Sequence, residues 1–183
     1  MAEIINVEVV DLQTKFIDAM VTRLQAIKWG KEAGLQNVSS EGKVSDFMDL
    51  LKVNSYTIKW VSKEELPEII NRLTFEGSEI WDSLKEIPDQ LSNKIKQAGH
   101  EKLLLELGDR VPELIFHGAY SHLFQQFKEK KTIEYLVGLA MYVSVMACTA
   151  ELAGEENIFL PIVELVEAGH LPIGPEGNTF YIL

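Results

Sequence analysis

The sequence contains a single cysteine, Cys148, among its 183 residues. An internal disulfide needs two cysteines, and the common zinc and redox motifs also use paired cysteines. The sequence therefore excludes an internal disulfide framework and indicates neither of those sites. Residues 1–11 also lack the basic segment that opens a secretory signal peptide. Both absences favour a reducing compartment, and we expect a cytoplasmic protein.

Short motifs for catalysis and nucleotide binding are absent as well. There is no P-loop, no Gly-x-Gly-x-x-Gly, no His-Glu-x-x-His, no Gly-x-Ser-x-Gly and no EF-hand loop. Residues 174–178 contain two glycines, but no lysine and no helical pattern follow them, so they predict a turn. We therefore expect no cofactor.

Positive charge is scarce, above all near the C-terminus. The chain has 17 basic and 28 acidic residues, a net charge of −11, so we expect it to bind neither nucleic acid nor an anionic membrane. Residues 132–183 contain no Lys or Arg at all. The acidic residues of this segment are Glu134, Glu151, Glu155, Glu156, Glu164, Glu167 and Glu176. Such a surface either attracts a basic partner or only keeps the protein soluble.

The composition is that of an ordinary globular protein, with 46% hydrophobic and 25% charged residues. A chain of this length corresponds to about one domain, so we expect residues 1–183 to form a single globular domain. Helical spacing of apolar residues recurs along the chain, beginning with residues 11–29, and predicts a mainly α, compact multi-helix fold. Residues 34–45 are polar and rich in turn formers, and predict a flexible loop.

The most apolar element is expected to be a central helix over about 133–153. Residues 135–150 are all uncharged, but these 16 positions are fewer than the roughly 20 that a bilayer requires. We therefore interpret the segment as a buried helix. Ala140, Ser144, Ala147 and Gly154 form a line of small residues that lets another helix approach closely, and Cys148 is expected to be buried beside it.

Three further features complete the expected fold. Alternating residues near 56–61 predict one short strand, and two short extended runs around 174–178 predict a C-terminal β-hairpin. Asp109 and Pro112 are expected to open a strong helix. Its aromatic stripe is interpreted as part of the core and consists of Phe116, Tyr120, Phe124 and Phe127.

A site built from glutamate and histidine is one alternative. Glu113 and His117 are four residues apart on one helix, and His122 with Glu151 from the adjacent helix would complete a set of metal ligands. However, His117 and His122 would lie about 140° apart around the helix, which is poor geometry for shared ligation. We therefore expect no metal site and assign no catalytic residue.

The favoured hypothesis is a non-enzymatic, soluble interaction or inhibitor-type (immunity-like) protein that binds a basic protein partner through an acidic C-terminal surface. Glu155, Glu156, Glu164 and Glu167 are its expected contact residues. Opposite charges across such an interface accelerate association. The alternatives are a small helical enzyme or metal-binding protein with a Glu/His site, and a subunit of a homo-oligomeric structural assembly.

Overall fold

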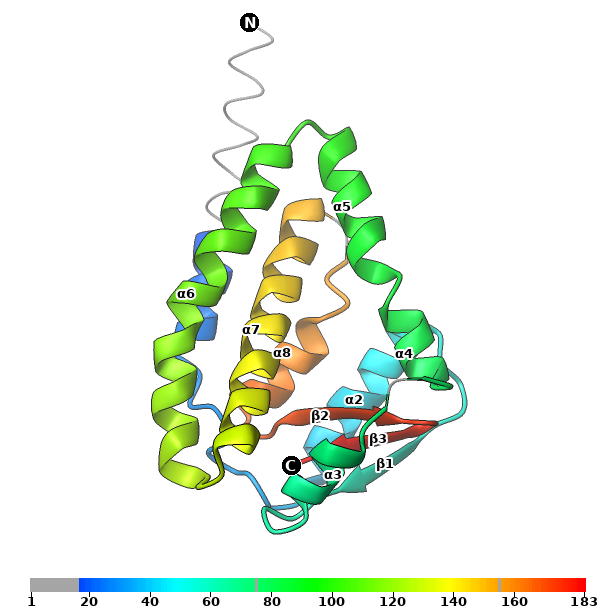
Figure 1. Ribbon diagram of the computed structural model, residues 1–183. Helices are drawn as coiled ribbons and strands as arrows, with labels where there is room; N and C mark the ends of the chain where they lie inside the picture. Colours follow the sequence, from blue (N-terminus) through cyan, green and yellow to red (C-terminus); the bar gives the residue numbers. More distant parts are fainter. Residues whose placement is uncertain (1–16, 75, 155) are drawn as a thin grey trace, which may run out of the picture.

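The computed structural model describes residues 17–74, 76–154 and 156–183, and the fold is mainly helical (Figure 1). Residues 17–25 are helical. The helices that follow are α2 (Val38–Leu51), α3 (Leu66–Arg72), α4 (Glu79–Leu84), α5 (Ile87–Gln97), α6 (Glu101–Gln126), α7 (Lys130–Ala153) and α8 (Leu160–Glu167). The strands are β1 (Thr57–Trp60), β2 (Pro172–Glu176) and β3 (Thr179–Ile182). This arrangement confirms the expected mainly α fold with one short strand and a C-terminal hairpin.

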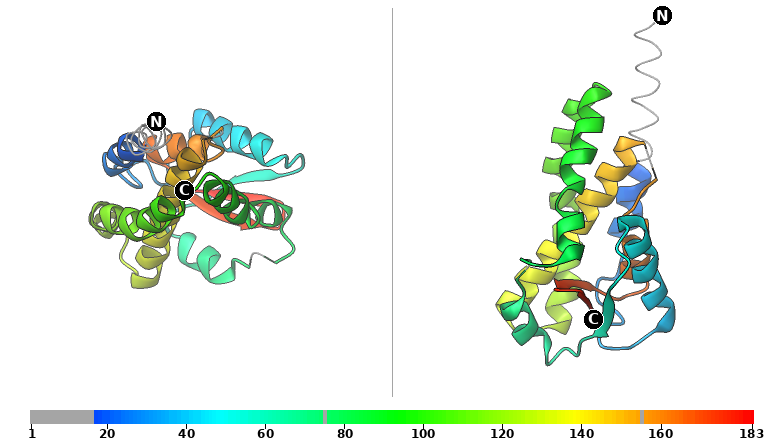
Figure 2. Two further views of the ribbon diagram at one scale, coloured as in Figure 1. Left: turned by 90° about the horizontal axis from the view of Figure 1, so that it is seen from above. Right: turned by 90° about the vertical axis from the view of Figure 1, so that its right-hand side faces the viewer.

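Helix α7 is the central helix, as predicted. It contacts α3, α5, α6, α8 and β2, and the long helices α6 and α7 run along each other in Figures 1 and 2. Ser144, Ala147 and Cys148 are completely buried in it. The helix ends at Gly154, whose positive φ of 76° is a left-handed conformation that glycine adopts without a steric penalty.

By length and composition alone, α7 is also apolar enough to cross a membrane. Its most apolar 18-residue window has a mean hydropathy of 1.7, and 61% of that window is buried inside the fold. Burial of this kind is what the core helix of a globular protein requires, and α7 has that position here.

The sheet has the order β1-β3-β2. Strand β3 pairs in parallel with β1 and antiparallel with β2, and Gly177 lies at the turn between β2 and β3 with a φ of 57°. The apolar residues at the chain end are buried in this arrangement: Phe180, Tyr181, Ile182 and Leu183. The hairpin therefore anchors the tail in the core, near one end of the long helices (Figure 2).

The expectation of a flexible loop over 34–45 is wrong from Val38 onward, where α2 begins. Asn37 is the N-cap, because its side-chain oxygen accepts a hydrogen bond from the backbone N–H of Ser39 at 2.9 Å. The buried apolar residues of α2 have helical spacing and are Val44, Phe47, Met48 and Leu51. The polar composition of this segment reflects the solvent-facing side of a helix.

The aromatic residues expected in the core of α6 are mostly exposed. Phe116, Tyr120 and Phe124 are 40%, 42% and 59% exposed, and of the expected set Phe127 alone is buried. The helix also begins at Glu101, before the expected start near Asp109. Its buried face is a parallel series with the same spacing of four: Leu107, Val111, Ile115, Ala119 and Leu123. This aliphatic series faces the core, where α6 packs along α7.

Candidate functional site

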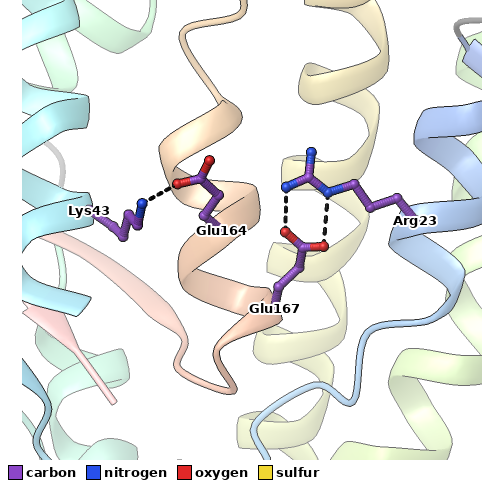
Figure 3. Close-up of polar contacts among 4 residues, drawn as sticks. All are labelled: Arg23, Lys43, Glu164 and Glu167. Carbon is purple, nitrogen blue, oxygen red and sulfur yellow. Dashed lines mark hydrogen bonds and ion pairs between the residues drawn. The ribbon is translucent and has the colours of Figure 1, made fainter. Parts of the chain in front are cut away.

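Helix α8 carries two of the four glutamates that the sequence assigned to a partner site. Its residues Ile162, Val163, Leu165 and Val166 are buried against the core, and the helix contacts α2. Glu164 and Glu167 remain at its surface. They point in different directions, Glu164 towards α2 and Glu167 towards the helical residues 17–25 (Figure 3).

Both of these carboxylates have a cation partner within the chain. Glu167 accepts two hydrogen bonds from Arg23, from Nε at 2.8 Å and from Nη2 at 2.5 Å. Glu164 forms an ion pair with Lys43 of α2. Hydrogen bonding to Glu167 raises the pKa of Arg23, and hydrogen bonding to Glu164 raises the pKa of Lys43. The outer face of α8 is therefore charge-balanced.

The remaining two predicted residues precede α8. Glu156 is exposed after the end of α7, and Glu155 lies outside the described residues. Residues 132–183 contain no cation, so the glutamates of this segment look unpaired in the sequence. Their partners Lys43 and Arg23 come from elements far away in the sequence.

The residues of the Glu/His alternative are not gathered into one site. Glu113 and His117 are exposed on α6, and the ring of His117 lies against Phe116 with 5.5 Å between centroids. Glu151 instead accepts a hydrogen bond from Asn157 at 2.8 Å. Within the described ranges, no group of three or more His, Cys, Asp or Glu side chains is placed to hold a metal ion.

An unexpected surface feature is the aromatic stripe on α6, formed by Phe116, Tyr120 and Phe124. The ring centroids of successive residues are 5.8 Å and 5.6 Å apart, and the ring planes differ by 20° and 18°. None of the three rings belongs to the apolar core cluster. Leu105, which is 66% exposed, lies about 20° from Phe116 around the helix and extends the same face.

Acidic side chains accompany the aromatic stripe. Asp109 and Glu113 are exposed, and their helical positions are within about 60° of Phe116. The aromatic stripe is therefore an apolar surface bordered by negative charge. The sequence shows that these rings are spaced four residues apart. The neighbouring series from Leu107 to Leu123 has the same spacing, so spacing alone does not show which series is exposed.

The second unexpected feature is an apolar pocket of about 390 Å³ between α2, α4, α7, α8 and the β2–β3 hairpin. Phe47, Trp81, Tyr135 and Phe159 are among its walls. The hydroxyl of Tyr135 donates a hydrogen bond of 2.5 Å to the carbonyl of Ile173, and burial raises the pKa of this tyrosine to about 12. Because the walls come from separate elements, no local sequence signal reveals this pocket.

Comparison with known proteins finds no matching family model, no matching curated protein and no matching solved structure. Function is therefore inferred from the charge, exposure and geometry of this chain alone.

Proposed function

We propose that the protein is a non-enzymatic interaction protein of the inhibitor or immunity type that binds a basic protein partner. The observation that carries this proposal is the exposed aromatic stripe of Phe116, Tyr120 and Phe124. Aromatic residues are enriched in the cores of protein interfaces and supply much of their binding energy. A contiguous apolar patch on a soluble surface is typical of an interaction site.

The charge of the chain defines the chemistry of the partner. With a net charge of −11, long-range attraction accelerates the approach of a basic protein, whereas two copies of this chain repel each other. Asp109 and Glu113 place negative charge beside the rings themselves. A partner surface that combines apolar side chains with Lys or Arg would complement both features.

The acidic C-terminal surface is a second candidate contact region. It is supported by the absence of Lys and Arg from residues 132–183 and by the exposure of Glu156. A partner that bound Glu164 or Glu167 would have to displace Lys43 or Arg23, so little free energy would be gained there. We therefore assign the main contact to the aromatic stripe and long-range attraction to the C-terminal glutamates.

Calorimetric titration with a designed amphipathic helix of Lys and Leu tests this assignment. The control peptide has Glu in place of each Lys. We expect the protein to bind the Lys peptide only, with an affinity that falls steeply between about 50 and about 300 mM salt. The triple variant F116S/Y120S/F124S should bind at least about tenfold more weakly.

The matched control is L35S/V38S, which removes two other exposed apolar side chains, 60% and 82% exposed, from a different part of the surface. This variant should bind like the wild type. Equal binding of both peptides, or full binding by the triple variant, would contradict the proposal. If the wild type forms a dimer and the triple variant does not, the aromatic stripe would instead be the contact surface between two copies of this chain.

A further inference from the structure

The apolar pocket has the size and walls of a small-molecule site. Its volume of about 390 Å³ falls within the roughly 300–1,000 Å³ that is usual for such sites. Six aromatic residues line it: Phe47, Trp81, Tyr135, Tyr142, Phe159 and Phe180. Aromatic walls favour a flat aromatic ligand, because ring–ring contacts add stabilisation beyond the burial of apolar area.

Part of the pocket wall belongs to the packed core and is therefore preformed. Phe47, Phe159 and Phe180 are at most 3% exposed, and the rings of Phe47 and Phe159 pack with centroids 5.9 Å apart. The hydrogen bond from Tyr135 to Ile173 joins α7 to β2 at the pocket wall. A ligand would therefore enter an existing space without ordering a loop.

Gly138 keeps one wall of the pocket open. It lies in the middle of α7, and a Cβ atom added to it would meet no other atom within 4 Å. A larger side chain at this position would extend into the space that a ligand needs. Gly138 therefore offers a direct way to fill the pocket without disturbing the packed face of α7.

The polar groups of the pocket define the charge of its ligand. Among the described lining residues, Glu134 carries the one carboxylate, and no lining residue is cationic. The side chain of Glu134 is 62% exposed. Lys130 forms an ion pair with that carboxylate at 3.8 Å, but its side chain is 90% exposed, so solvent screens this pair and an amine ligand could take the place of Lys130 at little cost. The hydroxyl of Tyr142, which is 38% exposed, is a second polar group of the lining and stays protonated, because burial raises its pKa. A negatively charged ligand would be repelled and an amine attracted.

We propose that this pocket binds an aromatic amine, with the ring system between the aromatic walls and the positively charged amino group at Glu134. No residue of α6 lines the pocket. Ligand binding here is therefore separate from partner binding at the aromatic stripe, and failure of one proposal leaves the other in place.

The test compares two probes with the same ring system and opposite charge, 2-naphthylmethylamine and 2-naphthylacetate, by calorimetry at neutral pH. We expect the amine to bind at least about tenfold more tightly than the carboxylate. Glu134→Gln should retain binding of the ring but remove most of this preference. Binding should also change the fluorescence of Trp81, which lines the pocket.

Gly138→Leu should weaken binding of the amine at least about tenfold, because the new side chain occupies the pocket. The matched control is Gly118→Leu, the same substitution in the middle of α6, where an added Cβ also meets no atom within 4 Å. It should bind the amine like the wild type. Thermal melts of both variants establish that they are folded.

A measurement on the wild type keeps the test independent of any variant. Methyl resonances of Leu139 and Ile173, which line the pocket, should shift on addition of the amine, and those of the distant Leu105 should not. Absence of binding, stronger binding of the carboxylate, or unchanged binding by a folded Gly138→Leu would each overturn the proposal.

Discussion

The guanidinium of Arg23 and the carboxylate of Glu167 form two hydrogen bonds, at 2.8 Å and 2.5 Å, across 144 residues of sequence. This bidentate pair joins the helical residues 17–25 to α8. Bidentate geometry makes it stronger than a single-contact surface pair. Both side chains are about one-third exposed, so solvent and salt screen the interaction.

Glu167→Lys should therefore lower the free energy of unfolding by up to about 1 kcal/mol, since a screened pair is lost and two cations become neighbours. The double variant Arg23→Glu with Glu167→Lys should recover most of the loss. Urea denaturation measures both effects, and about 1 M salt should reduce them. Strictly additive effects of the two substitutions would show that the pair does not contribute to stability.

His170 predicts a pH dependence of stability. Its ring is 1% exposed and lies against Trp60 at 4.9 Å, and its Nδ1 has no hydrogen-bond partner among the described residues. Burial lowers its pKa below the ordinary 6.5, although a backbone hydrogen bond with Leu183 and the charge of Glu32 act in the opposite direction. The neutral ring is thus favoured in the folded state.

Below pH 6.5 the unfolded chain takes up a proton at this histidine before the folded chain does. The contribution of His170 to stability is therefore complete above that pH and is lost as the pH falls through the folded pKa. Urea melts between about pH 7.5 and about pH 5.5 should show this loss, and His170→Gln should reduce it. The exposed His117→Gln is the control, and an equal pH dependence in all three proteins would refute the prediction.

Cys148 should be unreactive in the folded protein. It is completely buried, and burial together with the nearby charge of Glu151 raises its pKa to about 12. Thiol reagents require an accessible thiolate. We expect no reaction with a disulfide reagent in native buffer and one equivalent in guanidinium chloride, because the chain has one cysteine. Rapid native labelling would show that α7 opens readily.

Ala147→Glu should leave little folded protein. Ala147 is completely buried in α7, and its carbonyl accepts a hydrogen bond from Asn157 at 3.0 Å. Burying an unpaired carboxylate costs several kcal/mol, a large part of a typical stability of about 5–15 kcal/mol. Lys130→Glu, at a side chain that is 90% exposed, should be tolerated. Soluble yield and thermal melts compare the two variants, and equal melting temperatures would contradict the central position of α7.

The elements that could be predicted from the sequence have strong local patterns. The 16 uncharged residues of 135–150 mark a continuous apolar helix, and Gly174 to Asn178 mark the hairpin turn locally. For α6, by contrast, the local pattern did not determine which face of the helix is buried. Two neighbouring series in this helix have the same spacing of four, and that local spacing does not distinguish the series that packs against α7 from the series that faces solvent.

The candidate sites depended on contacts that no local pattern reveals. Glu164 and Glu167 look like one acidic edge in the sequence, but Lys43 and Arg23 neutralise them from other elements. The apolar pocket likewise forms only when α2, α4, α7, α8 and the hairpin come together. In both cases the properties of the site depend on contacts between elements that are far apart in the sequence.

The most direct test of the central claim is an amide chemical-shift titration of the protein with the amphipathic Lys peptide. We expect the shifts to concentrate on α6 around Phe116, Tyr120 and Phe124 and to be smaller on α8. Shifts centred on residues 156–167, or no saturable shifts on α6, would contradict the assignment of the aromatic stripe as the surface that binds a basic partner.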